Sequence, residues 1–175
     1  MKSKRKGSNY EREIAKKLSR WWDPSSKEIV FWRTHSSGAA KHLSSQQQGD
    51  IYSLQEDSKI LIKNVLIECK HYKEFNLFKI ITKGKIPLKE WIKKYQLESE
   101  VYKKKYFWII FRLNHYPDMI FVNKRFFNKF KKYLKNLNHI QLTFEKGGVI
   151  FLLDEFLDVI TPEVIKKEFG GSENV

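Results

Sequence analysis

The hexapeptide YFWIIF, residues 106–111, is the feature that most constrains how this chain can fold. Every residue in it is apolar, and no polar residue alternates with the others. Such a run is typical of a central strand that is covered on both faces of a sheet. Residues 119–122 follow as a candidate neighbouring strand. The rest of the chain must therefore supply enough apolar surface to cover two faces.

Apolar residues recur at helical intervals in several other segments. The first segment begins at Ser8, has Glu11 in the spacing of a capping box, and should end near Asp23. Thr161 is suited to cap a last short helix that starts at Pro162. The other two predicted helices cover residues 87–105 and 124–135.

The predicted strands lie between these helices. Residues 50–54 and 59–70 have the composition of two strands joined across 55–58, which favours an antiparallel hairpin. The remaining strands are expected at residues 28–33, 139–145 and 149–153, the last two forming a hairpin that turns at Gly147 and Gly148.

This order of elements indicates an α/β or α+β fold, with a mixed β-sheet flanked by helices. At 175 residues the chain is long enough for a single domain with a real core, so we expect one domain over residues 1–175. Residues 1–7 are predicted to form a mobile basic arm, and residues 170–175 a flexible tail.

The formal net charge is +14, from 34 Lys and Arg against 20 Asp and Glu. Such an excess indicates a polyanionic partner, and we expect nucleic acid. The single cysteine, Cys69, excludes an internal disulfide and any zinc site with several thiolates. No apolar run approaches the length of a membrane span, so we expect no membrane partner and a cytoplasmic protein of a bacterium, an archaeon or a phage-infected host cell.

The segment NVLIECK, residues 64–70, places charges in an apolar strand. Because side chains alternate along a strand, Glu68 and Lys70 share one face while Cys69 points to the other. An isolated E-x-K pattern is also compatible with a neutralised ion pair at a strand end. Asp50 decides between the two, because it follows a glycine at the start of the adjacent predicted strand and can lie beside Glu68.

Two neighbouring carboxylates repel, and a hard dication removes that repulsion. Mg²⁺ binds through one or two carboxylates and keeps positions for phosphate oxygens, so we predict an Mg²⁺ site at Asp50 and Glu68, with Mn²⁺ as a substitute. The backbone carbonyl of Cys69 is a further candidate ligand. Lys70 would orient or activate the attacking water and offset charge in the transition state. The predicted reaction is phosphodiester hydrolysis.

The first predicted helix offers a third carboxylate. Glu11 shares a face with Ile14 and Leu18 and can point inward, whereas Glu13 has Lys17 in the favourable i,i+4 position. We therefore choose Glu11 as a catalytic residue that supports the metal directly or through a water. Its alternative role is that of the capping-box glutamate.

These residues resemble the PD-(D/E)XK nucleases, with Gly49-Asp50 and Glu68-Cys69-Lys70 as the two halves of the motif. The opening KGSNYEREIAKKL is similar to that of archaeal Holliday junction resolvases, where the matching glutamate, here Glu11, is catalytic. The order of motifs over roughly residues 4–80 is closer still to a set of phage-encoded endonucleases. The resemblance implies a metal-dependent endonuclease with a restriction-endonuclease-like core, often a homodimer, acting on branched DNA. Gly49 stands where the family has proline.

DNA contacts are expected from the basic arm and from the polar segment after the first strand. Arg33 resembles the arginine that ends the corresponding strand in the junction resolvases, and hydroxyls and cations near it suit phosphate contacts. The candidates are Lys4, Arg5, Lys6, Arg33, Ser36, Ser37 and Lys41. The basic helix at 124–135 is expected to bury its aromatic residues and to contribute only diffuse attraction.

Three functions remain open from the sequence. The leading one is an endonuclease that cuts four-way junctions, and the second is a nuclease of the same class that cuts linear duplex or flap DNA. The third is a basic nucleic-acid-binding module without catalysis. A binding module gains nothing from carboxylates placed where phosphate must approach, which favours the nucleases.

Overall fold

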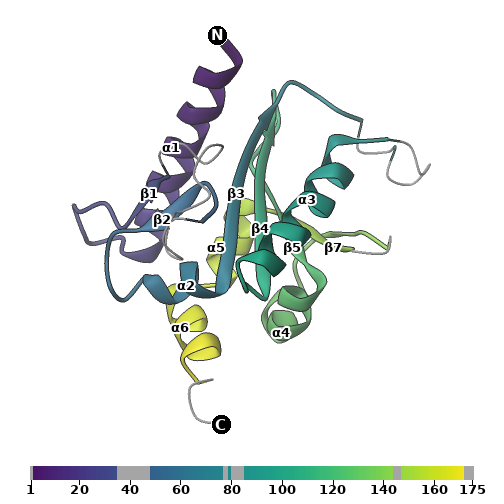
Figure 1. Ribbon diagram of the computed structural model, residues 1–175. Helices are drawn as coiled ribbons and strands as arrows, with labels where there is room; N and C mark the ends of the chain where they lie inside the picture. The colour runs from purple at the N-terminus through teal and green to yellow at the C-terminus, as the bar shows by residue number, and fades with distance from the viewer. Residues whose placement is uncertain (1, 35–47, 77–78, 80–84, 144–146, 172–175) are drawn as a thin grey trace.

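A computed structural model describes residues 2–34, 48–76, 79, 85–143 and 147–171 (Figure 1). Its centre is a mixed five-stranded sheet in the order β3-β4-β5-β7-β6. β3 and β4 are parallel, and each of the other neighbouring pairs is antiparallel. The strands of this sheet are β3 (Val65–Tyr72), β4 (Tyr106–Leu113), β5 (Met119–Asn123), β6 (Ile140–Gln141) and β7 (Gly148–Leu152).

The described residues form six helices around the sheet: α1 (Lys2–Trp22), α2 (Lys59–Asn64), α3 (Pro87–Val101), α4 (Lys124–Leu134), α5 (Leu153–Val159) and α6 (Pro162–Gly170). The apolar residues of α3 pack on one face of the sheet, while those of α1, α4, α5 and α6 pack on the other (Figure 1). This arrangement is an α+β fold with a mixed sheet flanked by helices, as the sequence predicts.

The apolar run at 106–111 behaves as expected of a central strand. It forms most of β4, which lies between β3 and β5. Trp108 and Ile110 belong to the core on the α1 side, and Phe107 and Ile109 belong to the core under α3. Alternate side chains of one strand therefore fill two separate cores, which explains why no polar residue interrupts it.

The predicted hairpin of residues 50–54 and 59–70 is wrong. Residues 59–64 form α2, and only Val65 onward continues as a strand. β2 (Ile51–Ser53) pairs with β1 (Phe31–Arg33) in a separate two-stranded sheet. A short apolar segment fits a buried helix as well as a strand, and here Leu61 and Ile62 are buried from a helix.

The N-terminal prediction also needs correction. α1 begins at Lys2, so residues 2–7 continue the helix and do not form a separate basic arm. Lys and Arg are good helix formers, which allows the extension. Ser8 consequently lies inside the helix, and the predicted capping box with Glu11 does not form at a helix start.

The later elements follow the prediction more closely. α3, α4 and the β6–β7 pair lie within or near their predicted ranges. The Thr161 hydroxyl accepts a hydrogen bond from the backbone N–H of Val164 and caps α6. α5 was not predicted, and the tail residues 172–175 lie outside the described residues. Within the described part of the chain, no helix has the length and apolarity needed to cross a bilayer.

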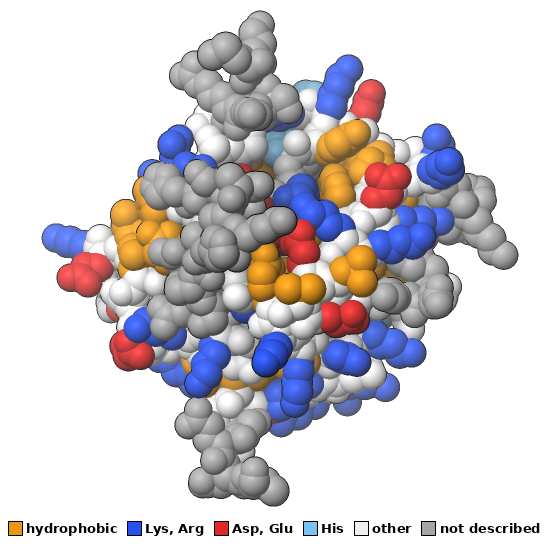
Figure 2. Space-filling model, viewed as in Figure 1, with side chains coloured by type: hydrophobic (Ala, Val, Ile, Leu, Met, Phe, Trp, Pro, Cys, Tyr) orange, Lys and Arg blue, Asp and Glu red, His pale blue; other side chains and the backbone are white. Residues whose placement is uncertain are grey.

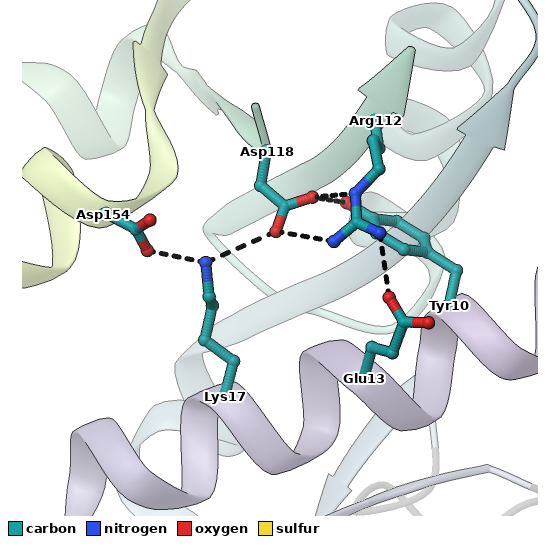
Figure 3. Close-up of polar contacts among 6 residues, drawn as sticks. All are labelled: Tyr10, Glu13, Lys17, Arg112, Asp118 and Asp154. Carbon is teal, nitrogen blue, oxygen red and sulfur yellow. Dashed lines mark hydrogen bonds and ion pairs between the residues drawn. The ribbon is translucent and has the colours of Figure 1, made fainter. Parts of the chain in front are cut away.

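A polar network holds α1 against the sheet (Figure 3). The buried Asp118 carboxylate accepts hydrogen bonds from the Tyr10 hydroxyl at 3.0 Å and from Arg112 Nε at 2.8 Å. Lys17 contacts both Asp118 and Asp154, and Arg112 also contacts Glu13. The i,i+4 pair expected between Glu13 and Lys17 is thus replaced by partners on other elements. This network sets the position of α1, the helix that carries Glu11.

Candidate active site

β3 places Glu68 and Lys70 on one face of the sheet, as the alternation of its side chains predicts. Lys70 Nζ lies 3.0 Å from Glu68 Oε2. Cys69 belongs to the core on the opposite face, together with Ile67. The pattern E-x-K in this strand therefore brings a carboxylate and an ammonium into contact under α3.

Asp50 reaches this pair by a route that the sequence did not predict. It precedes β2, and its backbone N–H donates to the Ile67 carbonyl of β3 at 2.9 Å. Its carboxylate accepts a hydrogen bond from the Cys69 N–H at 2.9 Å. The chain therefore docks on the free edge of β3 at one residue, without a hairpin.

Gly49 makes this docking sterically possible. Its φ is +87°, a left-handed conformation that side chains disfavour. A Cβ atom at this position would lie 2.7 Å from the Ile67 carbonyl oxygen. A glycine therefore fits here both because of its backbone conformation and because of the close approach to β3.

Three oxygen atoms surround the Lys70 ammonium. They belong to Asp50 at 3.2 Å, Glu68 at 3.0 Å and the Cys69 backbone carbonyl at 3.0 Å. Asp50 is 4% exposed and Glu68 is 6% exposed. The Lys70 side chain is 27% exposed, so it lies between the buried acidic pair and the solvent.

Burial and charge shift the proton affinities in this cluster. Burial raises the pKa of Glu68 to about 8, the charge of Asp50 acts in the same direction, and Lys70 opposes both. Burial lowers the pKa of Lys70, but the two carboxylates outweigh burial and hold this pKa well above its usual range. Lys70 is therefore an ammonium at neutral pH, and its positive charge favours the ionised form of the buried acids beside it.

Tyr95 of α3 completes the cluster, and sequence reasoning missed it. Lys70 Nζ lies 5.2 Å from the centre of its ring. Burial, followed by the charge of Glu68, raises the pKa of the Tyr95 hydroxyl, and the charge of Lys70 opposes both. The available signal was a tyrosine at an inward position of an amphipathic helix, since a buried hydroxyl usually needs a partner.

Glu11 has a different partner. Its carboxylate accepts a hydrogen bond from Arg33 Nε at 3.0 Å, and both side chains are largely buried. Its charge also contributes to raising the pKa of the Cys69 thiol, after burial and the charge of Asp50. Within the described residues, no three His, Cys, Asp or Glu side chains are grouped to hold one ion. Asp50, Glu68 and Lys70 are thus brought together, and Glu11 is paired with Arg33.

The other sequence-predicted contacts are only partly described. Lys6 donates to the Asn114 side chain at 2.8 Å, which joins α1 to the turn after β4. Lys4 and Arg5 lie in α1, but their side chains are not described. Ser36, Ser37 and Lys41 lie outside the described residues.

The donor set fits a hard divalent cation. Asp50, Glu68 and the Cys69 carbonyl are oxygen donors that already converge on one positive charge, the Lys70 ammonium. Mg²⁺ prefers oxygen ligands and needs only one or two carboxylates. Two buried acids of like charge are also stabilised by any cation placed between them.

An α+β sheet whose strand β3 carries E-C-K beside a docked G-D is the arrangement that defines a PD-(D/E)XK nuclease. A comparison with family models agrees: the model described as "Phage putative PDDEXK endonuclease" matches residues 2–167. The chain belongs to this family, and it is therefore a nuclease by class. No curated protein and no solved structure matched the chain.

Proposed function

We propose that this chain is an Mg²⁺-dependent endodeoxyribonuclease. The observation that carries the proposal is the convergence of Asp50, Glu68 and the Cys69 carbonyl on one cationic centre. Its membership of a nuclease family and its net charge of +14 support DNA as the substrate.

Asp50 and Glu68 would hold the cation, with the Cys69 carbonyl as a further ligand and Glu11 supporting it directly or through a water. Mg²⁺ bound there supplies Lewis-acid chemistry, polarising the scissile phosphate and lowering the pKa of a water. Mn²⁺ can replace it because both are hard cations that accept oxygen ligands.

Lys70 would act on the water and on the reacting phosphate. When Asp50 and Glu68 hold the cation, the Lys70 ammonium would be released from them. It could then orient the attacking water and offset negative charge on the pentavalent transition state. The water oxygen forms a bond to phosphorus and gives up a proton, the bond between phosphorus and the leaving sugar oxygen breaks, and that oxygen takes up a proton. Tyr95, whose ring lies beside the Lys70 ammonium, would keep that side chain in position.

DNA would enter from the side of Arg33, with Lys4, Arg5, Lys6, Ser36, Ser37 and Lys41 as further contacts. We propose branched DNA, such as a four-way junction, as the preferred substrate, and a homodimer as the active form, because two symmetric cuts require two sites. The proposed place of action is the cytoplasm of the phage-infected host.

The test is cleavage of a labelled immobile four-way junction and of linear duplexes with the same arms. Each substrate is incubated with Mg²⁺, with Mn²⁺ and with EDTA, and Lys70→Ala is the control variant. Paired symmetric nicks in the junction alone would support the full proposal. Cutting of linear duplex as well would keep the nuclease and remove the junction preference, and binding without cleavage under any metal would refute it.

A further inference from the structure

A basic groove lies at the sheet edge opposite β3. It is a cavity of about 550 Å³ between α4 and the β6–β7 pair. Lys124, Lys131 and Lys135 line it from α4 and its C-terminal end, and His139 lines it from the segment before β6. None of the described residues that line it is an Asp or a Glu. We call it the α4 groove.

The lysines of α4 are divided between two sides of the helix. Lys129 and Lys132 lie 3.8 Å and 2.8 Å from the Glu168 carboxylate of α6. By contrast, the described part of the chain offers no ion-pair partner to Lys124, Lys131 or Lys135. The groove side of α4 thus carries positive charge that the described residues do not neutralise, and an anion can bind there without displacing a salt bridge between described residues.

The three groove lysines form a stripe along the helix. Positions 124, 131 and 135 are seven and four residues apart, and these intervals return to the same helix face. At about 1.5 Å per residue the stripe is roughly 16 Å long. A stripe of this length matches several successive phosphates of one strand and is too long for a single small anion.

The start of α4 carries an electrostatic conflict. Lys124 and Arg125 occupy its first two positions, and its first turn has no acidic residue. Cations at a helix N-terminus are unfavourable because the helix dipole is positive there. A bound phosphate beside Lys124 would relieve this repulsion.

The α4 groove continues toward α3. A smaller hollow of about 380 Å³ shares Lys124, Asn128 and Gly147 with the groove, and reaches Gln96 and Glu100 of α3. α3 is the helix that carries Tyr95. Four strand spacings of about 4.8 Å separate β3 from β6, roughly 19 Å in all, which corresponds to five or six base pairs.

We propose that the α4 groove binds the phosphate backbone of the DNA substrate at a second place, away from the scissile phosphate. The proposal rests on the proposed function in that the ligand is DNA. Lys and Arg side chains dominate the part of the surface where α4 lies, in the lower right of the view (Figure 2). A second contact of this kind would give affinity and orientation without a role in bond breaking.

The test is metal-free binding of a labelled linear duplex at several salt concentrations. The variant Lys131→Gln/Lys135→Gln removes two groove charges, and Lys27→Gln/Lys167→Gln removes two exposed charges outside the groove. Each phosphate contact contributes about 0.9 to the slope of log affinity against log salt. The groove variant should bind about tenfold more weakly and lose roughly 2 from that slope, while the control keeps most of both.

Equal losses in the two variants would show diffuse attraction only and would overturn the proposal, as would unchanged binding in the groove variant. Both variants are first compared with the wild type by thermal unfolding. Because the measurement is made in EDTA, it can succeed or fail whether or not the protein cleaves DNA. If the protein does cleave, the groove variant should raise KM and leave kcat near the wild-type value.

Discussion

Arg33 Nε donates a hydrogen bond to Glu11 Oε2 at 3.0 Å, joining the end of β1 to α1. The two side chains are 15% and 17% exposed. The sequence assigned them different tasks, a DNA contact for Arg33 and a catalytic carboxylate for Glu11. Their contact means that a substitution at either residue also changes the environment of the other.

We expect Arg33→Ala to weaken DNA binding and to lower the salt slope by about 0.9, because one phosphate contact is lost. Glu11→Gln should keep binding while reducing cleavage. Binding is measured by anisotropy at several salt concentrations, and Arg33→Lys tests whether charge alone is sufficient. Unchanged affinity for Arg33→Ala at every salt concentration would remove Arg33 from the interface.

Asp50→Asn, Glu68→Gln and Lys70→Ala should each reduce cleavage by about 100-fold or more while leaving DNA binding largely intact, because in the proposed mechanism each group acts at the reacting phosphate. Single-turnover cleavage and metal-free binding are measured on the same preparations. Lys70→Ala removes the partner of two buried acids, so its folding is verified by circular dichroism. Wild-type cleavage by a folded Lys70→Ala variant would contradict its assignment.

Mg²⁺ should stabilise the folded protein, because the folded chain gathers Asp50 and Glu68 and the unfolded chain does not. At a concentration of ten times the Kd, the expected gain is about 1.4 kcal/mol in the free energy of unfolding. Thermal unfolding is followed during an Mg²⁺ titration, in the absence of DNA. Asp50→Asn should lose most of the increase in Tm, and an equal increase in both proteins would place the cation elsewhere.

The buried Lys104 should make the free energy of unfolding depend on pH in the alkaline range. Its side chain is 5% exposed, donates to the Ile62 carbonyl at 2.8 Å, and has its pKa lowered by burial to about 8 from an ordinary 10.5. Between these two values the unfolded chain binds the extra proton, so stability rises with pH over this window.

Relative to Lys104→Met, the wild type should therefore gain about 3 kcal/mol between pH 7 and pH 10.5. Urea unfolding of both proteins across this range measures the difference, and the variant cancels the titration of all other groups. A constant difference at every pH would show that the buried amine is not destabilised as an ammonium.

Asp118 should contribute strongly to the stability of the α1–sheet interface. Burial alone would raise its pKa, but hydrogen bonds from Arg112 and Tyr10 outweigh burial and lower it. The contribution of Asp118 to the free energy of unfolding is therefore present above the ordinary pKa of a carboxyl, and it is lost as the pH falls below that value.

Asp118→Asn should destabilise the protein by about 3 kcal/mol at neutral pH, because Arg112 loses its buried partner. Asp154, 74% exposed, is the control, and Asp154→Asn should change the free energy of unfolding by less than about 0.5 kcal/mol. Chemical unfolding at pH 7 and at acid pH is the measurement, and equal effects of the two substitutions would contradict the role of the buried network.

Several features could be predicted because they depend on neighbouring residues. Four such features span only a few positions of the chain each. They are the alternation that puts Glu68 beside Lys70, the apolar strand at 106–111, the periodicity of α3 and the Thr161 cap. Each depends on local backbone geometry, and the alternation in β3 and the periodicity of α3 follow the period of two in strands and 3.6 in helices.

The sequence by itself therefore determined which residues share a face, and it placed Glu68 and Lys70 together. Only the tertiary structure decided that residues 59–64 fold as a helix, that Asp50 docks on Ile67 through a single backbone hydrogen bond, and that Tyr95 closes the cluster. The tertiary structure also decided that Glu11 forms an ion pair with Arg33 and that Asp118 forms one with Arg112. These contacts join segments that are distant along the chain. The local sequence pattern is compatible with several partners and conformations for each segment, and tertiary packing selects one of them.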